Sequence, residues 1–211
     1  MLILAFDTAT PAVTVALRDD SGVLAEESRV DARRHGELLA PLIERVLTKA
    51  GTTPGELTGI AVGTGPGPYT GLRVGLVTAQ VLASALGIGI DGICTLDVIA
   101  AGVQRVRRDF VVATDARRRE VCWARYKAGG ERLTEPAVSR PFAAGCPVAG
   151  EGPVLYPEMT AEPIGPRYPE AARLADLAAG RAAQGIAAPA VPLYLRRPDA
   201  AEPRPPKRVT P

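Results

Sequence analysis

The chain has 211 residues, of which 46% are hydrophobic and 23% charged, and its net charge is +2. These values are typical of a globular protein and exclude collagen-like, coiled-coil and largely disordered chains. One histidine and three dispersed cysteines cannot supply the close-spaced ligand pairs of a structural zinc site, so we expect no metal. The N-terminus lacks the basic segment of a signal peptide, and the longest apolar run is too polar for a membrane span. We therefore expect a cytoplasmic protein without a membrane partner.

The first hundred residues alternate between strand and helix patterns. An apolar run ends at Asp7, and turn-forming residues at 19–22 predict that the next two strands form a hairpin. The period then changes to that of an amphipathic helix, which Gly51 would cap at its C-terminal end. The predicted strands are 2–6, 13–17, 23–30, 57–63 and 88–93, and the predicted helices are 37–50 and 70–86.

The opening pattern recurs at an offset of 108 residues. A second apolar strand ends at Asp115, and a hairpin turn and a third strand follow it in the same order. Such self-similarity predicts two similar lobes, 1–103 and 104–197. The second copy is degenerate, because its helix is postponed to about 169–183. Residues 198–211 are rich in Pro and Arg and are predicted to be a disordered tail. The matched pairs are Asp7 and Asp115, Val13 and Val121, Ala16 and Ala124, Gly22 and Gly130, and Val30 and Val138.

Two α/β lobes, each of order β-β-β-α-β-α with an acidic residue ending its first strand, resemble the actin-like ATPase superfamily, which shares the RNase H-like fold. In that superfamily the two first hairpins cradle nucleotide phosphates, usually through Asp-x-Gly. Here Asp7-Thr8-Ala9 and Asp115-Ala116-Arg117 lack the glycine, and a Cβ hinders close approach of a phosphate. We therefore interpret Asp7, Thr8, Asp115 and Arg117 as possible vestiges of phosphate loops. Hydrogen bonding within the hairpin is the alternative role of Asp7.

A Gly/Pro-rich loop at 63–75 joins a predicted strand to a predicted helix. It matches neither a P-loop nor a dinucleotide fingerprint, although free N–H groups at the helix start could bind an anion. Along the helix, Gly71, Gly75, Ala79 and Ala83 form a stripe of small residues, while Val74, Val77, Val81 and Ala85 form an opposite apolar face. A helix that is apolar on both faces is buried on both. One face can pack on its own sheet; the other requires the 37–50 helix or another chain. Both purely internal packing and an intermolecular role remain open.

The same loop, Gly65-Pro66-Gly67-Pro68-Tyr69-Thr70-Gly71-Leu72-Arg73-Val74-Gly75, resembles the signature of the TsaB (YeaZ-type) family of bacterial tRNA threonylcarbamoyladenosine biosynthesis proteins. Further segments agree with this family over about residues 1–197. They are Asp7-Thr8-Ala9, His35, Asp115-Ala116-Arg117-Arg118 and Pro192-Leu193-Tyr194-Leu195-Arg196. Pro68 and Tyr69 depart from the usual Ser and Phe.

The resemblance implies a non-catalytic relative of the transferase TsaD, whose His-x-x-x-His metal pair has no counterpart at 94–100 here. It implies a scaffold subunit that forms a heterodimer with a TsaD-like paralogue and is joined by a TsaE-like ATPase. The complex makes N6-threonylcarbamoyladenosine at position 37 of tRNAs that read codons starting with A. The assembled complex uses ATP, whereas this chain requires no cofactor. The expected partner interface on the helix pair comprises His35, Leu38, Leu42, Leu72, Gly75, Leu76, Ala79 and Ala83.

Other readings stay open. The chain could be an actin-like-fold ATPase or kinase, or a metallopeptidase-like hydrolase, acting alone, but fold analogy is its only support. The two-faced helix also favours a homodimer when the chain is alone. Residues 1–100 carry 7 basic and 11 acidic groups, whereas 101–211 carry 18 and 12, with a cluster at Arg117-Arg118-Arg119. This cluster is either solvated surface or a contact to tRNA within the complex.

Overall fold

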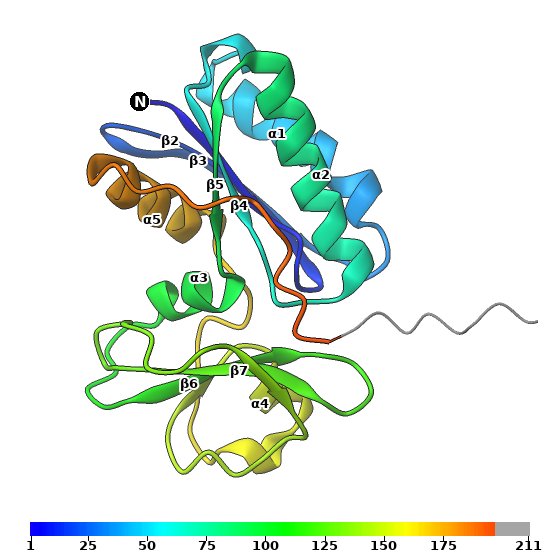
Figure 1. Cartoon of the computed structure of the whole chain (residues 1–211), viewed down its shortest axis with the longest axis vertical. Helices are drawn as coiled ribbons and strands as arrows, with labels where there is room; N and C mark the ends of the chain where they lie inside the picture. The colour runs from blue at the N-terminus through cyan, green and yellow to red at the C-terminus, as the bar shows by residue number, and fades with distance from the viewer. Residues whose placement is uncertain (197–211) are drawn as a thin grey trace, which may run out of the picture.

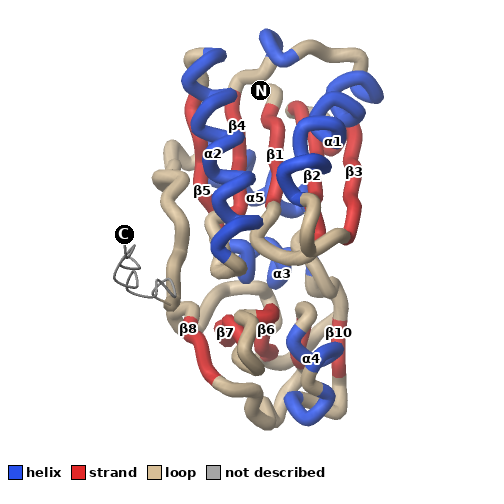
Figure 2. Tube along the Cα trace, turned by 90° about the vertical axis from the view of Figure 1, so that its right-hand side faces the viewer, coloured by secondary structure: helices blue, strands red, loops and turns tan. Residues whose placement is uncertain are grey.

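The computed structural model describes residues 1–196 as two stacked lobes, each built on a sheet of five strands (Figure 1). In the first sheet the order is β3-β2-β1-β4-β5; β1 is antiparallel to β2 and parallel to β4. Figure 2 shows α1 and α2 side by side over one face of this sheet. The elements are β1 (Ile3–Asp7), β2 (Ala12–Asp19), β3 (Gly22–Val30), α1 (His35–Ala50), β4 (Gly59–Gly63), α2 (Tyr69–Leu86) and β5 (Gly89–Ile93).

The second sheet repeats this order as β8-β7-β6-β9-β10, with β6 in the place of β1. β6 is likewise antiparallel to its hairpin partner β7 and parallel to β9. The predicted α/β duplication and actin-like fold are thereby confirmed. Residues 140–147 form bends and loop where the first lobe has α1, so the second lobe is smaller, as predicted. Its elements are β6 (Phe110–Asp115), β7 (Val121–Tyr126), β8 (Ala137–Ser139), β9 (Val148–Ala149), α4 (Gly152–Leu155) and β10 (Pro163–Ile164).

Each lobe is followed by a helix that packs on the sheet of the other lobe. Helix α3 (Thr95–Gly102) follows β5, and its Leu96 and Ile99 pack in the second lobe against Phe110 and Tyr126. Helix α5 (Ala171–Ala183) follows β10 and covers the back of the first sheet, where Leu174 lies in a fully buried cluster. The two helices also contact each other where the lobes meet.

This exchange corrects the predicted lobe boundaries of 1–103 and 104–197. Helix α5 was assigned to the second lobe from its position in the chain, but it packs on β1 and β2 of the first. The segment after it, residues 186–196, which we term the C-terminal strap, returns along β5 and α2 (Figure 1). The Pro/Arg-rich tail predicted at 198–211 lies outside the described residues.

The stripe of small residues on α2 faces its own sheet. Gly71 and Gly75 lie against the β1–β2 turn, and Ala79 and Ala83 are buried in the same core. The interface predicted from the sequence therefore requires correction, because all but two of its residues are buried in this lobe. The buried ones are Leu42, Leu72, Gly75, Leu76, Ala79 and Ala83. Leu38 is half-buried against the same core, and His35 is half-buried at the start of α1.

The opposite face of α2 points to solvent. Val77 is 54% exposed and Val81 is 61% exposed. Arg73 is the one charged residue among the 18 residues of this helix. Over residues 1–196, no helix combines the length and apolarity needed to cross a membrane.

We predict that Ala79→Arg destabilises the first lobe, because Ala79 is 0% exposed and the new guanidinium would have no partner in the core. The expected loss in the free energy of unfolding is about 3–5 kcal/mol, measured by urea denaturation. Ala85→Arg is the matched control, since Ala85 is exposed on the same helix. A wild-type midpoint for Ala79→Arg would contradict the assigned orientation of α2.

Candidate functional site

Asp7 ends β1 beneath the loop that joins β4 to α2, and it is fully buried. Its Oδ1 accepts the backbone N–H of Ala9 at 2.7 Å, and its Oδ2 accepts the hydroxyl of Thr95 at 2.7 Å. Burial raises the pKa of Asp7, because the charged form loses its hydration; these hydrogen bonds and the charge of His35 act in the opposite direction. The carboxyl group therefore serves the hairpin and the adjoining loop.

Thr95 fastens this loop to the start of α3. Its Oγ accepts the N–H of Gly65 at 3.1 Å, and its own N–H donates to the carbonyl of Gly65 at 2.7 Å. The loop passes so close to Asp7 that a Cβ at Gly63 would lie 1.9 Å from Oδ2 of Asp7. Sequence reasoning missed Thr95, and the one signal for it was its position two residues after β5, the strand that neighbours β4.

Thr8 connects the β1–β2 turn to the first turns of α2. Its hydroxyl donates to the carbonyl of Gly71 at 2.7 Å and accepts the N–H of Gly75 at 3.0 Å. A Cβ at Gly67 would lie 1.9 Å from the carbonyl oxygen of Ala9, and one at Gly71 would lie 2.6 Å from that of Thr8. The glycines of the loop thus let α2 approach the turn. The start of α2 therefore packs directly on the backbone of the β1–β2 turn.

The second lobe repeats the hydrogen bond of the first turn. Oδ1 of Asp115 accepts the N–H of Arg117 at 2.9 Å, as Asp7 accepts that of Ala9. Asp115 remains half-buried, and its Oδ2 lies 3.4 Å from the guanidinium of Arg117. The equivalence between Asp7 and Asp115 therefore extends to the structure of both turns.

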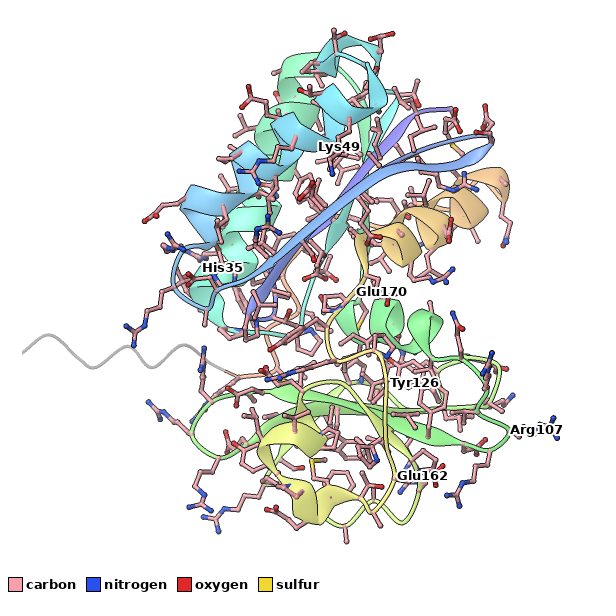
Figure 3. All side chains as sticks on the ribbon, turned by 180° about the vertical axis from the view of Figure 1, so that it is seen from behind. His35, Lys49, Arg107, Tyr126, Glu162 and Glu170 are labelled. Atoms are coloured by element: carbon pink, nitrogen blue, oxygen red, sulfur yellow. The ribbon has the colours of Figure 1, made fainter. Side chains whose placement is uncertain are left out.

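The two turns meet at one cavity of about 230 Å³. Thr8, His35 and Arg117 are among its lining residues, and Nε2 of His35 donates to the carbonyl of Thr10 at 2.8 Å. Figure 3 shows His35 near the start of α1, on the side of the first lobe that faces the second. The structure thus brings Thr8, His35 and Arg117 together, whereas Asp7 lies beneath them.

The segment 94–100 uses its polar side chains to join α3 to β7. Asp97 accepts the hydroxyl of Tyr126 at 2.8 Å and the guanidinium of Arg132 at 3.1 Å, and burial raises its pKa. Burial likewise raises the pKa of the Cys94 thiol to about 12, so this thiol is protonated at neutral pH. Within residues 1–196, no three His, Cys, Asp or Glu side chains are arranged to hold a metal ion.

The C-terminal strap adds an aromatic cluster that the sequence did not predict. Tyr194 stacks on Tyr69 at the start of α2, with ring centroids 5.3 Å apart. Arg73 lies over the ring of Tyr69 at 3.9 Å and donates from Nε to the hydroxyl of Tyr194 at 3.0 Å. Arg196 then reaches the second lobe, where it lies 3.0 Å from Glu120. The strap therefore ties the start of α2 to the β6–β7 turn.

Comparison with known proteins agrees with this arrangement. A family model for TsaD, tRNA N6-adenosine threonylcarbamoyltransferase, matches residues 20–152. An uncharacterized protein of Mycobacterium tuberculosis is 46% identical over 203 residues, covering 94% of this chain and 93% of that protein. The tRNA threonylcarbamoyladenosine biosynthesis protein TsaB of Escherichia coli is 38% identical over 129 residues, covering 60% of this chain and 55% of that protein. The solved structure of YeaZ from Pseudomonas aeruginosa has a TM-score of 0.79 at 28% identity, covering 92% of this chain and 100% of that one.

Two sheets of equivalent order, with acidic residues ending their first strands at a shared mouth, define a protein of the actin-like ATPase fold. The chain belongs to the tRNA N6-adenosine threonylcarbamoyltransferase family and, within it, to the TsaB/YeaZ type. Family membership connects it with the biosynthesis of threonylcarbamoyladenosine in tRNA.

We predict that Gly67→Ala lowers the free energy of unfolding by about 1–3 kcal/mol, because its Cβ would overlap the carbonyl of Ala9. Urea denaturation followed by circular dichroism measures the loss. Gly59→Ala is the control, since its Cβ would meet no atom within 4 Å. Equal stability of the two variants would show that α2 does not need this close approach.

Asp7→Asn tests the buried carboxyl through pH. The folded-state pKa of Asp7 is raised above its ordinary value of 3.8, so its contribution to stability is full below that value and is lost as pH rises through the folded pKa. The stability of the wild type relative to Asp7→Asn should therefore fall as pH rises from 3.8 towards neutrality.

Urea midpoints at several pH values give this difference. Asp19→Asn should show the opposite trend, because hydrogen bonds from Ser21 lower the pKa of the exposed Asp19. A difference between wild type and Asp7→Asn that is independent of pH would contradict the burial of the Asp7 carboxyl.

Proposed function

We propose that this chain is a non-catalytic scaffold subunit of the complex that makes N6-threonylcarbamoyladenosine at position 37 of tRNAs reading codons that start with A. Its partner is a TsaD-like catalytic paralogue. A TsaE-like ATPase joins them, and ATP is consumed by the assembled complex rather than by this chain. The observation that carries the proposal is the exposed apolar face of α2, in a chain of the TsaB/YeaZ type.

The internal hydrogen bonding of the first turn supports a role without chemistry. Thr8 and Asp7 are buried, and their hydrogen bonds go to α2, α3 and the hairpin itself. The Asp97 carboxylate likewise accepts hydrogen bonds from Tyr126 and Arg132. The hydrogen bonds of these polar side chains stabilise the fold, and this supports a structural role rather than a catalytic one.

The outer face of α2 supports a protein partner. Val77 and Val81 lie side by side on this face, and Ala85 continues it by one turn. Helix α1 borders the face, and its exposed residues include Glu44 and Arg45. An apolar centre with a charged border is the usual composition of a protein interface. The face therefore replaces the buried small-residue stripe as the proposed docking surface.

The same face accounts for the other proposed assemblies. A second copy of the chain would cover Val77 and Val81 when the paralogue is absent, and a homodimer would then compete with the heterodimer. The paralogue removes this competition when it binds more tightly. Contact with tRNA would follow from assembly, because the substrate must reach the catalytic subunit beside this chain.

We predict that Val81→Arg abolishes the one-to-one complex with the paralogue and any homodimer, because a charge would be buried at the centre of the interface. Size-exclusion chromatography with mass detection measures both, for the chain alone and mixed with the paralogue of its own organism.

Val154→Arg is the matched control, because Val154 is 51% exposed on α4 of the second lobe. It should assemble like the wild type, and both variants should keep the wild-type urea midpoint. A heterodimer that tolerates Val81→Arg would refute the assigned face. No complex with the wild type would refute the proposed function.

A further inference from the structure

The turn between β6 and β7 has an unusual backbone. Arg117, Arg118 and Arg119 have φ angles of 63°, 55° and 57°, in the left-handed region. This conformation is unfavourable for residues other than glycine, because Cβ lies too close to the following carbonyl oxygen. Strain of this kind persists where the surrounding structure holds it and is concentrated at functional sites. All three residues are exposed. Three arginines in succession thus occupy a strained turn at the mouth between the lobes.

Three cavities meet at this turn. The first, of about 220 Å³, has Arg117, Arg118 and Arg196 in its lining, together with the stacked Tyr69 and Tyr194. The second, of about 230 Å³, is lined by Arg33 and Arg117. The third, of about 420 Å³, is lined by Arg118, Arg119 and Arg140. Adjacent cavities share an arginine of the turn, so together they form one basic track.

Few negative charges balance this track. Among the residues that line the three cavities, Glu158 is the one carboxylate. Asp115 lies 3.4 Å from Arg117, and Glu120 lies 3.0 Å from Arg196. Arg33, Arg119 and Arg140 line the same cavities and add positive charge along the mouth. Such positive charge attracts a polyanion and favours a partner with several phosphates.

We propose that this track, made of Arg33, Arg117, Arg118, Arg119, Arg140 and Arg196, binds the sugar-phosphate backbone of RNA. The continuity of the track favours an extended polyanion over a single nucleotide, because adjacent cavities share Arg117 or Arg118. The stacked rings of Tyr69 and Tyr194, which are partly exposed, lie beside the track in the lining of the first cavity. The proposal deepens and rests on the proposed function, in which the substrate is a tRNA.

The test compares two double variants of the full chain. Arg117→Asn with Arg119→Asn removes two charges from the turn, and asparagine tolerates the left-handed backbone. Arg105→Asn with Arg107→Asn is the matched control, because both arginines are exposed and Arg105 also has a positive φ. In Figure 3, Arg107 lies beyond the start of β6, at the end of the strand opposite the turn.

Fluorescence anisotropy with a labelled tRNA transcript at several salt concentrations gives the affinity and its salt dependence. We expect the turn variant to bind at least about fivefold more weakly at low salt, with a slope of log K against log salt smaller by about 1.4, the value for two lost phosphate contacts. The control variant should stay within about twofold of the wild type. Equal weakening of both variants would show diffuse attraction and overturn the proposal.

Two further arms separate this proposal from its alternatives. Displacement of the tRNA by ATP or inorganic triphosphate at similar charge concentration would indicate a small-anion site and overturn the RNA track. Each titration is repeated with the paralogue present. If the wild type shows no salt-dependent binding of tRNA either alone or with the paralogue, the RNA track is overturned as well. Size-exclusion chromatography of the turn variant with the paralogue should show an intact complex. If the wild type forms no complex with the paralogue, the proposed function is refuted. The anisotropy titrations of the isolated chain still test the RNA track in that case.

Discussion

The contact between the β1–β2 turn and the first turns of α2 is the constraint on which the rest of this structure depends. The Thr8 hydroxyl bonds to both Gly71 and Gly75, and this contact is possible only because neither residue has a side chain. The loop before the helix is held down by Thr95 and, through it, by the buried Asp7. The β1–β2 turn is thereby used for internal packing.

The same contact decides what α2 presents to its surroundings. With its glycines and alanines against the sheet, the helix must turn its valines outward, and Val77 and Val81 are exposed as a result. The buried small-residue stripe and the exposed apolar surface are therefore two consequences of one helix position. The strap adds to this by placing Tyr194 against Tyr69 at the start of the helix. Together, these features fit a protein that acts through its surfaces.

Much of the fold could be predicted from the sequence, because the duplicated strand pattern and the two acidic turns are local signals. The end of α1 at Gly51 could also be predicted, and Gly51 adopts the left-handed conformation there. The face of α2 that meets the sheet could not be predicted in this way. Small residues on one side and branched apolar residues on the other give no local indication of which side is buried. Thr95 and the packing of α5 depend on contacts between distant segments. Periodicity carries no information about such contacts.

The exchange of α3 and α5 between the lobes has a consequence for synthesis of the chain. The back of the first sheet is covered by a helix that begins at Ala171, so this sheet stays half-covered until nearly the whole chain has left the ribosome. In contrast, α3, which packs on the second sheet, is synthesised before β6, the first strand of that sheet. The first lobe thus completes its core last, although it is made first. Because each sheet packs against a helix from the other half of the chain, we expect the two lobes to unfold in a single cooperative transition.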